Sequence, residues 1–447
     1  MITDSPVRAV LLFAVPVAIG SLFQSLYNTM DSIIIGRFLG ARALAAVGST
    51  AQITGFFLMI SIALTTAFSV MTAQYFGARN NEMVRRTAVG CIYIVAAGSA
   101  VIGAAGAAFA RPIMTMMQAD ALIIDDAVLY MRICVGLCFG QVAYNATASI
   151  LRAIGDSRTP LYFLILSSIL NVVLNITFVA VFGMGVAGVA IATVIAQVAS
   201  AAACIWYTWK KYPIFHFTGQ DLKPDWKLIW DTLKLGLSLS VQLFVTSLGD
   251  VVISARINSF GVVTVTAYTA VSQIMRFATM LFSSISNGFS VFAGQNFGAG
   301  LYDRVKSGFK KVAVISVLTA AAGAAVMLLF GTAFIRAFLS EADPHFAQVL
   351  VQARQYQIIS GVCYPFLALV WMYNQTLRGM GEALVPMAAG ITEIVFKLAG
   401  ALVLSSVIGV TGLWLASPVG WIFGIIPGAL YYHSGKWIQK KRIRQSA

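Results

Sequence analysis

The sequence predicts an all-α integral membrane protein, with 12 transmembrane helices in two pseudo-symmetric six-helix bundles. Three observations lead to this prediction: the composition, a series of long apolar runs, and an internal repeat. Apolar residues make up 59% of the 447 residues, and charged residues make up only 10%. A soluble globular protein carries about 25% charged residues, so a soluble protein with an unusually apolar core is the weaker alternative.

The apolar runs are long enough, at about 20 residues each, to cross a bilayer as helices. The first six lie near residues 10–36, 44–74, 87–110, 127–150, 160–182 and 186–209. The second six lie near residues 230–256, 262–293, 311–336, 347–376, 384–408 and 412–435. The first run is too long for the apolar part of a cleavable signal, so we expect it to remain as a helix.

The distribution of basic residues predicts the orientation of the chain. An even number of spans puts both termini on one side, and 21 of the 30 Lys and Arg residues lie in segments on that side, including "KK" at 210–211 and "KKRIR" at 440–444. The positive-inside rule makes that side cytoplasmic, in the inner (plasma) membrane. Most of the net charge of +14 therefore reflects topology and does not indicate a nucleic-acid surface.

The chain repeats itself across the hydrophilic segment 210–227. The repeated pairs are "AQYFGA" (73–78) with "GQNFGA" (294–299), "LRAIGDSRTP" (151–160) with "LRGMGEALVP" (377–386), and, more weakly, "VAGVAIAT" (186–193) with "VTGLWLAS" (410–417). We therefore predict an N-terminal lobe over 1–209, a cytoplasmic linker over 210–227, and a C-terminal lobe over 228–447. Duplicated bundles that rock about a site between them are typical of secondary transporters.

Two carboxylates lie inside predicted spans at matching places in the repeat. Asp31 is followed six residues later by Arg37, and Asp250 is followed six residues later by Arg256. Each Asp belongs to a polar stripe at helical spacing; the stripes are Gln24, Tyr27, Asn28 and Asp31, and Gln242, Thr246 and Asp250. Such stripes face a bundle interior or a wet cavity, where they function in transport or only bond helices together.

The motifs together resemble the multidrug and toxic compound extrusion (MATE) family of secondary transporters. They are "MDSIIIGRFLG" (30–40), "AQYFGA" and "GQNFGAG", "LRAIGD" (151–156) and "GVAGVAIAT" (185–193). The resemblance covers essentially the whole chain. It implies export of amphipathic, often cationic compounds, driven by inward movement of Na⁺ or H⁺ through alternating access, with no cofactor.

The resemblance also implies a cation-coupling site in the N-terminal lobe. Its residues would be Asp31 as the carboxylate, Asn171 and Asn175 on the fifth span, and Thr193 on the sixth. Related sequences often have Asp at the position of Asn175, and one fewer carboxylate weakens a Na⁺ site, so the coupling ion stays open. The seventh span has no Glu, which resembles the branch that relies on the N-terminal lobe.

Other polar residues within the spans are candidates for the substrate cavity. The full set is Gln24, Tyr27, Asn28, Gln242, Asp250, Arg276, Glu393 and Lys397. Glu393 and Lys397 lie one helical turn apart, either as an intrahelical ion pair or as a substrate or proton site. Arg276 lies near the middle of a span and needs a partner that the sequence does not name.

Two other functions fit the sequence less well. A flippase for lipid-linked sugars needs several Arg or Lys residues deep in its cavity to bind pyrophosphate, and only Arg276 and Lys397 lie deep. A membrane enzyme needs carboxylate pairs, a Ser–His pair or a zinc motif within the spans. The three histidines are scattered, and Cys134 and Cys138 are interpreted as packing residues. We expect no enzymatic activity, a monomer, and as partners only the bilayer and small amphipathic substrates.

Overall fold

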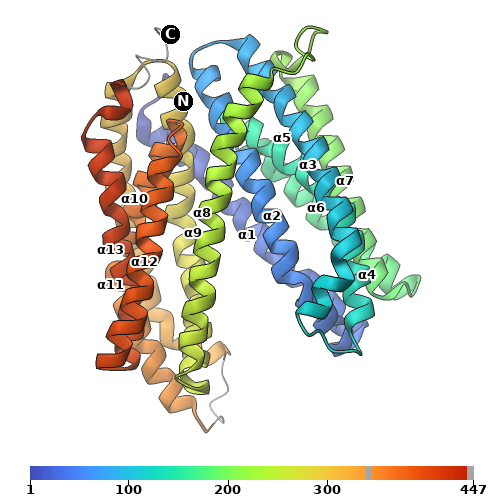
Figure 1. Ribbon diagram of the computed structural model, residues 1–447, viewed down its shortest axis with the longest axis vertical. Coiled ribbons are helices and arrows are strands. Elements are labelled where there is room, and N and C mark those ends of the chain that lie inside the picture. Colours follow the sequence, from blue (N-terminus) through green and yellow to red (C-terminus); the bar gives the residue numbers. More distant parts are fainter. Residues whose placement is uncertain (339–343, 440–447) are drawn as a thin grey trace. The chain divides into compact units, whose positions relative to one another are not determined.

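The computed structural model describes residues 1–338 and 344–439 (Figure 1). The basic run at 440–444 lies outside the described residues. The first helices are α1 (Pro6–Phe38), α2 (Gly40–Gly77), α3 (Asn81–Met116), α4 (Ile124–Gly136), α5 (Phe139–Ala153), α6 (Arg158–Ile176), the π-helical turn η1 (Thr177–Val181) and α7 (Gly185–Lys211). The rest are η2 (Pro213–Phe215), α8 (Trp226–Asn258), α9 (Val262–Gly298), α10 (Tyr302–Phe338), α11 (Phe346–Gly379), α12 (Leu384–Ile408) and α13 (Val410–His433).

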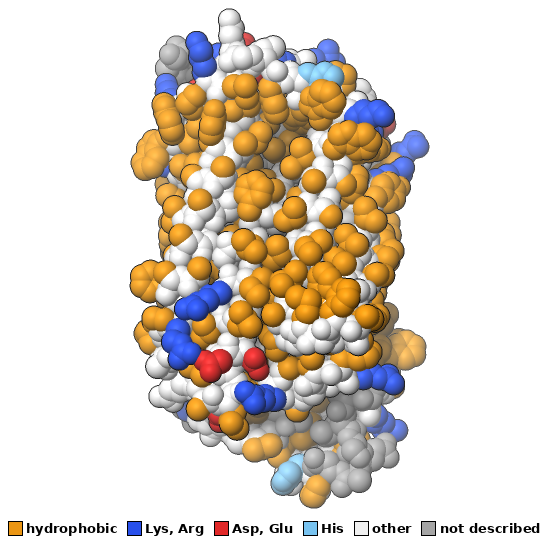
Figure 2. All heavy atoms as spheres, turned by 90° about the vertical axis from the view of Figure 1, so that its right-hand side faces the viewer, with side chains coloured by type: hydrophobic (Ala, Val, Ile, Leu, Met, Phe, Trp, Pro, Cys, Tyr) orange, Lys and Arg blue, Asp and Glu red, His pale blue; other side chains and the backbone are white. Residues whose placement is uncertain are grey.

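The described helices match the predicted spans one for one. Ten of them are long and apolar enough to cross a membrane, and α4 and α5 are so only when taken together, as a pair bent by 43°. The remaining run, 262–293, forms α9, a 37-residue helix with many Ser, Thr, Asn and Gln residues. Figure 2 shows one face on which hydrophobic side chains cover the middle and charged side chains gather toward the ends, as lipid contact requires.

The helices divide into two compact units. The N-terminal unit is Val15–Leu237, and the C-terminal unit combines Met1–Ala14 with Ser238–Ala447. The divisions fall inside α1 and α8, and segment 210–227 belongs to the N-terminal unit. Within each unit the helices run alongside one another (Figure 1), and each unit has its own buried aromatic and aliphatic core.

The repeated motifs adopt the same helix-ending turns in both units. In "LRAIGD" the amide N–H of Asp156 donates to the carbonyl of Leu151 at 2.9 Å, and Gly155 has φ of 100°. In "LRGMGE" the amide N–H of Glu382 donates to the carbonyl of Leu377 at 2.9 Å, and Gly381 has φ of 82°. Glycine adopts this left-handed conformation without steric cost, so it ends both helices.

Segment 212–225 is bound to the start of α3 within the N-terminal unit. Asp221, whose side chain is 4% exposed, accepts from Arg85 Nε at 2.9 Å and from Thr218 Oγ1 at 2.7 Å. The Tyr93 hydroxyl donates to the Leu222 carbonyl at 2.8 Å. The hydrogen bonds from Thr218, supported by the Arg85 ion pair, hold the pKa of Asp221 below its usual value.

Neutralising Asp221 will release this segment. The pKa of Asp221 is lower in the folded protein than in the unfolded chain, where it is about 3.9. The stabilisation that Asp221 provides is therefore fully present above the unfolded pKa, and it is lost only as the pH falls through the folded pKa. At pH 7, we expect Asp221→Asn to be cleaved by chymotrypsin within 212–225 several-fold faster than wild type. The control is Asp231→Asn, an exposed acid on α8 that pairs with Lys234. Equal cleavage of the two variants would show that Asp221 does not anchor the segment.

Close packing of α3 on the end of α4 depends on a glycine. A Cβ on Gly103 would lie 2.7 Å from the carbonyl oxygen of Gly136, and backbone at that distance cannot move aside cheaply. Gly98, on the same helix, has nothing within 4 Å of its Cβ position. The glycine at 103 therefore allows α3 to lie against the bend between α4 and α5.

Alanine at these two glycines will have opposite effects on stability. Gly103→Ala should lower the free energy of unfolding by about 2 kcal/mol through the backbone clash. Gly98→Ala should raise it by about 0.5–1 kcal/mol, because alanine is the better helix former and meets open space. Thermal unfolding of the two purified variants in the same detergent measures the difference, and similar Tm values would refute the close contact.

Candidate functional site

Asp31 is held by the amide of Asn175 inside the N-terminal unit. Asn175 Nδ2 donates to Asp31 Oδ1 at 2.6 Å and lies 3.0 Å from Asn171 Oδ1. Asn171 Nδ2 in turn donates to Thr193 Oγ1 at 3.2 Å. The structure therefore brings together, from α1, α6 and α7, the four residues for which the sequence predicts cation coupling.

The two asparagines are fully buried, and one of their oxygens has no hydrogen-bond donor. Asn171 and Asn175 are both 0% exposed. Within the described residues, Asn175 Oδ1 is buried without a hydrogen-bond partner. A buried polar atom left unpaired is unfavourable by about 1–3 kcal/mol, so this oxygen marks a place where an added proton or cation would be stabilised.

Local backbone structure places Asn175 at an irregular point of its helix. The π-helical turn Thr177–Val181 follows directly after α6. Two glycines with positive φ, Gly183 at 64° and Gly185 at 59°, then reverse the chain into α7. Single π-turns occur often at functional sites because they re-aim neighbouring side chains, and here the turn sets how α6 and α7 present Asn175 and Thr193.

The structure adds two residues of α4 to the surroundings of Asp31. Tyr130 and Cys134 both interact electrostatically with Asp31, and the Tyr130 hydroxyl and the Cys134 thiol interact with each other. Tyr27, which is 9% exposed, lies near Asp31, and within the described residues its buried hydroxyl has no hydrogen-bond partner. From the sequence alone, Cys134 is interpreted as a packing residue. The four-residue spacing of Tyr130 and Cys134 was the only available signal that they share a helix face.

A cavity lies beside this cluster in the N-terminal unit, among α2, α3, α4 and α5. Cys134 lines it and lies near Asp31. The other lining residues are Thr54, Phe57, Leu58, Ser61, Ile102, Val135, Cys138, Gln141 and Val142. Its volume of about 50 Å³ has room for a few water molecules and is too small for a drug-sized ligand.

Three predicted cavity residues are exposed. They are Gln24 and Asn28 on α1 and Arg276 on α9. Across residues 1–338 and 344–439 their side chains form no hydrogen bond or ion pair with other protein groups. The partner expected for Arg276 is therefore not found in the described structure.

The remaining candidates make contacts within the C-terminal unit. Gln242, which is 8% exposed, accepts a hydrogen bond from Arg378 Nη2 at 2.7 Å. Lys397 Nζ donates to Asp250 Oδ1 at 2.9 Å. The observed partner of Lys397 thus lies on α8 and is not Glu393 on its own helix, although Glu393 interacts electrostatically with both charges.

The chemistry available at Asp31 is cation binding. Asp31 supplies one full negative charge, and its hydrogen-bond partner Asn175 is neutral. The amide oxygens of Asn171 and Asn175 and the Thr193 hydroxyl are neutral oxygens of the same hydrogen-bonded chain. Among the described residues Asp31 has no positive partner, and a half-buried carboxylate of this kind is stabilised when a proton or a hard cation neutralises it.

Comparisons with known proteins agree with this arrangement of helices. The probable multidrug resistance protein YpnP of Bacillus subtilis is 28% identical over 432 residues, covering 96% of this chain and 95% of that protein. The probable multidrug resistance protein NorM of Thermotoga maritima is 24% identical over 439 residues, covering 96% and 93%.

Solved structures share the fold. A MATE crystal structure in complex with MaL6 superposes with a TM-score of 0.90 at 21% identity, covering 98% of each chain. A MOP superfamily transporter from Pyrococcus furiosus gives a TM-score of 0.88 at 21% identity, covering 96% of each chain. The profile of the MatE family matches residues 16–177 and 239–403 of this chain. That match spans well over half of the sequence and confirms the resemblance of the motifs, so the protein belongs to the MatE family.

Proposed function

We propose that this protein is a secondary active transporter that exports amphipathic or cationic drugs and toxic compounds by antiport with H⁺ or Na⁺. The observation that carries the proposal is the Asp31 carboxylate, bonded to the neutral amide of Asn175 inside an apolar helical unit. A membrane protein retains an unneutralised carboxylate in a span chiefly for ion or substrate pathways. Two relatives, YpnP and NorM, are named as probable multidrug resistance proteins.

Binding of the coupling ion at Asp31 would change the charge of the α1 surface that faces α6 and α7. With H⁺, the carboxyl group becomes neutral and gains a donor that the unpaired Asn175 oxygen can use. With Na⁺, the carboxylate and the oxygens of Asn171, Asn175 and Thr193 provide the ligands. Either ion favours a different packing of these helices, and the ion shifts that equilibrium only by its differential affinity for the two packings.

The predicted pair of lobes suits alternating access. A duplicated transporter exposes a site to each side of the membrane in turn by moving one half against the other. The excess of basic residues on one side supports cytoplasmic termini and insertion in the plasma membrane. A chain that carries both halves needs no second copy to complete the transport path, so we propose a monomer that performs transport and no enzymatic step.

The contacts of the buried cations favour multidrug transport over a flippase for lipid-linked sugars. A pyrophosphate site needs several positive side chains free to bind it. Lys397 is bound to Asp250, and Arg378 donates to Gln242. These two charges are engaged within the C-terminal unit. Arg276, the other cation expected to lie deep, has no such contact within the described residues, and one free cation is fewer than a pyrophosphate site needs.

Efflux from proteoliposomes under single gradients tests the proposal. Purified protein is reconstituted with ethidium or norfloxacin inside, and an opposing Na⁺ gradient or pH gradient is imposed alone. We expect one of the two gradients to accelerate drug release well above that of protein-free vesicles. Equal release with and without each gradient would reject ion-coupled export, whereas selective movement of a lipid-linked sugar would favour the flippase.

A further inference from the structure

The C-terminal unit has a counterpart of the Asp31 position. Asp250 lies on α8 six residues before Arg256, as Asp31 lies on α1 six residues before Arg37. The helices that pack on them are also equivalent, because α6 and α12 each follow an "LRxxG" turn and the same proline. Comparing what each helix presents to its Asp shows how the two copies of the repeat have diverged.

The side chains on α12 differ from those on α6 at the two positions equivalent to Asn171 and Asn175. Lys397 follows Leu377 of its turn by twenty residues, as Asn171 follows Leu151 by twenty residues. Lys397 is therefore the counterpart of Asn171. By the same register, Ala401 stands where α6 has Asn175, so the amide that bonds Asp31 has no counterpart near Asp250. A lysine thus replaces the paired amides in the C-terminal unit.

The lysine makes the contact that the amide makes in the other unit. Lys397 Nζ lies 2.9 Å from Asp250 Oδ1, compared with 2.6 Å between Asn175 Nδ2 and Asp31 Oδ1. The Lys397 side chain is only 15% exposed, while that of Asp250 is 55% exposed. The ammonium therefore bonds the carboxylate from the interior of the unit, the same side from which the asparagine bonds Asp31.

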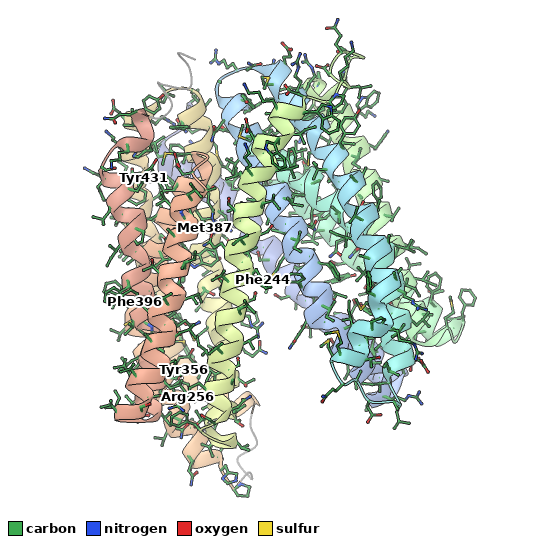
Figure 3. The ribbon with its side chains drawn as sticks, viewed as in Figure 1. Phe244, Arg256, Tyr356, Met387, Phe396 and Tyr431 are labelled. Carbon is green, nitrogen blue, oxygen red and sulfur yellow. The ribbon has the colours of Figure 1, made fainter. Side chains whose placement is uncertain are left out.

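Close helix packing holds this pair in place. Ile394 on α12 fills the space beside Gly249 on α8, where a Cβ would come within 2.7 Å of it. Farther along, Arg256 Nε donates to Ser405 Oγ at 3.0 Å, and Figure 3 labels Arg256 near the lower end of α8. The α8–α12 contact is thus fixed on both sides of the Asp250–Lys397 bond.

Helices α12 and α13 bring few other charges near the pair. Glu393 and Lys397 are the charged residues of α12, and α13 has none from Val410 to Tyr432. The stem of Glu393 packs against Gly424 of α13, at 3.0 Å from its Cβ position, and the Glu393 carboxylate interacts with both members of the pair. The Lys397 ammonium bonds Asp250 directly, and Glu393 lies near both charges.

We propose that Lys397 is a tethered cation that occupies the C-terminal counterpart of the Asp31 site. Its ammonium neutralises the Asp250 carboxylate permanently, whereas a proton or Na⁺ neutralises the Asp31 carboxylate reversibly. The C-terminal unit then takes up no ion from solution at this position, and the transporter uses one free cation, bound in the N-terminal unit, per cycle. The statement about stoichiometry rests on the proposed function, whereas the occupancy of the site by Lys397 does not.

Removing the side-chain amine will open this site to small free cations. The test measures the Tm of purified protein in the Asp31→Asn background, so that the N-terminal site cannot respond. Each sample receives NaCl, methylammonium chloride or N-methylglucamine chloride at equal ionic strength. Asp31→Asn protein with Lys397 intact should show the same Tm in all three salts. Asp31→Asn/Lys397→Ala should show a saturable rise in Tm with methylammonium, because this cation fits the space that the lysine ammonium leaves. A ligand that binds only the folded protein raises its Tm in this way.

A matched variant assigns the response to the carboxylate. Adding Asp250→Asn to the Lys397→Ala protein should remove the rise in Tm. The proposal is overturned if methylammonium has no effect on the Lys397→Ala protein, if the effect survives Asp250→Asn, or if the protein with native Lys397 responds equally. If Lys397→Ala prevents folding, the charge-neutral Asp250→Asn/Lys397→Ala protein should recover expression. Equal loss of expression in these two variants would also overturn the proposal. No transport is measured, so failed efflux would reject the proposed function alone.

Discussion

Asp31→Asn will abolish gradient-driven drug efflux while leaving the protein folded. Asparagine keeps the size and the hydrogen-bonding capacity of the side chain but removes the negative charge that binds the coupling ion. A charge-assisted contact worth about 2 kcal/mol corresponds to about thirty-fold weaker cation binding, so we expect less than about a tenth of the wild-type rate. The measurement is the initial rate of ethidium efflux from proteoliposomes under the active gradient, together with the Tm of the purified protein.

Two further variants show whether the loss belongs to this carboxylate. Ser32→Ala changes the next residue of α1, whose hydroxyl bonds only the Asn28 carbonyl of its own helix, and it should transport normally. Asp250→Asn should slow efflux less than Asp31→Asn, because Asp250 is already neutralised by Lys397. Wild-type transport by Asp31→Asn would move the coupling role to another acid, with Asp250 and Glu393 as the remaining candidates.

Asn175→Asp will change how transport depends on Na⁺. The new carboxylate would lie within hydrogen-bonding distance of Asp31, where two negative charges cannot both persist without a cation between them. A hard cation gains a second charged oxygen, and we expect half-maximal efflux at a Na⁺ concentration about tenfold or more lower than in wild type. Efflux rates measured across a Na⁺ series at constant pH give this value.

Asn175→Leu serves as the matched control for that change. Leucine has a similar volume but supplies neither the donor to Asp31 nor an ion ligand, so efflux should fall under both gradients. Indistinguishable Na⁺ dependence in Asn175→Asp and wild type would mean that residue 175 does not face the ion, despite its contact with Asp31.

Much of the fold could be predicted from the sequence because the bilayer restricts the possibilities. Each apolar run must form a helix to satisfy its backbone, so run lengths predict the spans directly. The repeated motifs were also informative, since "LRAIGD" and "LRGMGE" end their helices with equivalent turns at Gly155 and Gly381. The bend between α4 and α5 was not predicted, because 127–150 contains no proline to mark it.

Contacts between helices were harder to predict, because they depend on how each helix is rotated. The sequence indicated Asp31 by its chemistry, and the resemblance to the MATE family indicated Asn171, Asn175 and Thr193. Neither indicated Tyr130, because its neighbours in the sequence are like those of any aromatic residue in an apolar run. The partner of Lys397 was not predicted either. The sequence suggested Glu393, one turn away on the same helix, whereas Lys397 Nζ bonds Asp250 on α8, beside the close contact of Ile394 with Gly249.

The most direct test of the account is ion movement driven by the drug. Proteoliposomes receive an outward drug gradient with no ion gradient, and entry of Na⁺ or H⁺ is followed with ²²Na⁺ or an internal pH dye. We predict that drug release draws one ion species inward in wild type and that Asp31→Asn eliminates this flux. Drug-driven ion entry that persists in Asp31→Asn vesicles would contradict the assignment of coupling to Asp31.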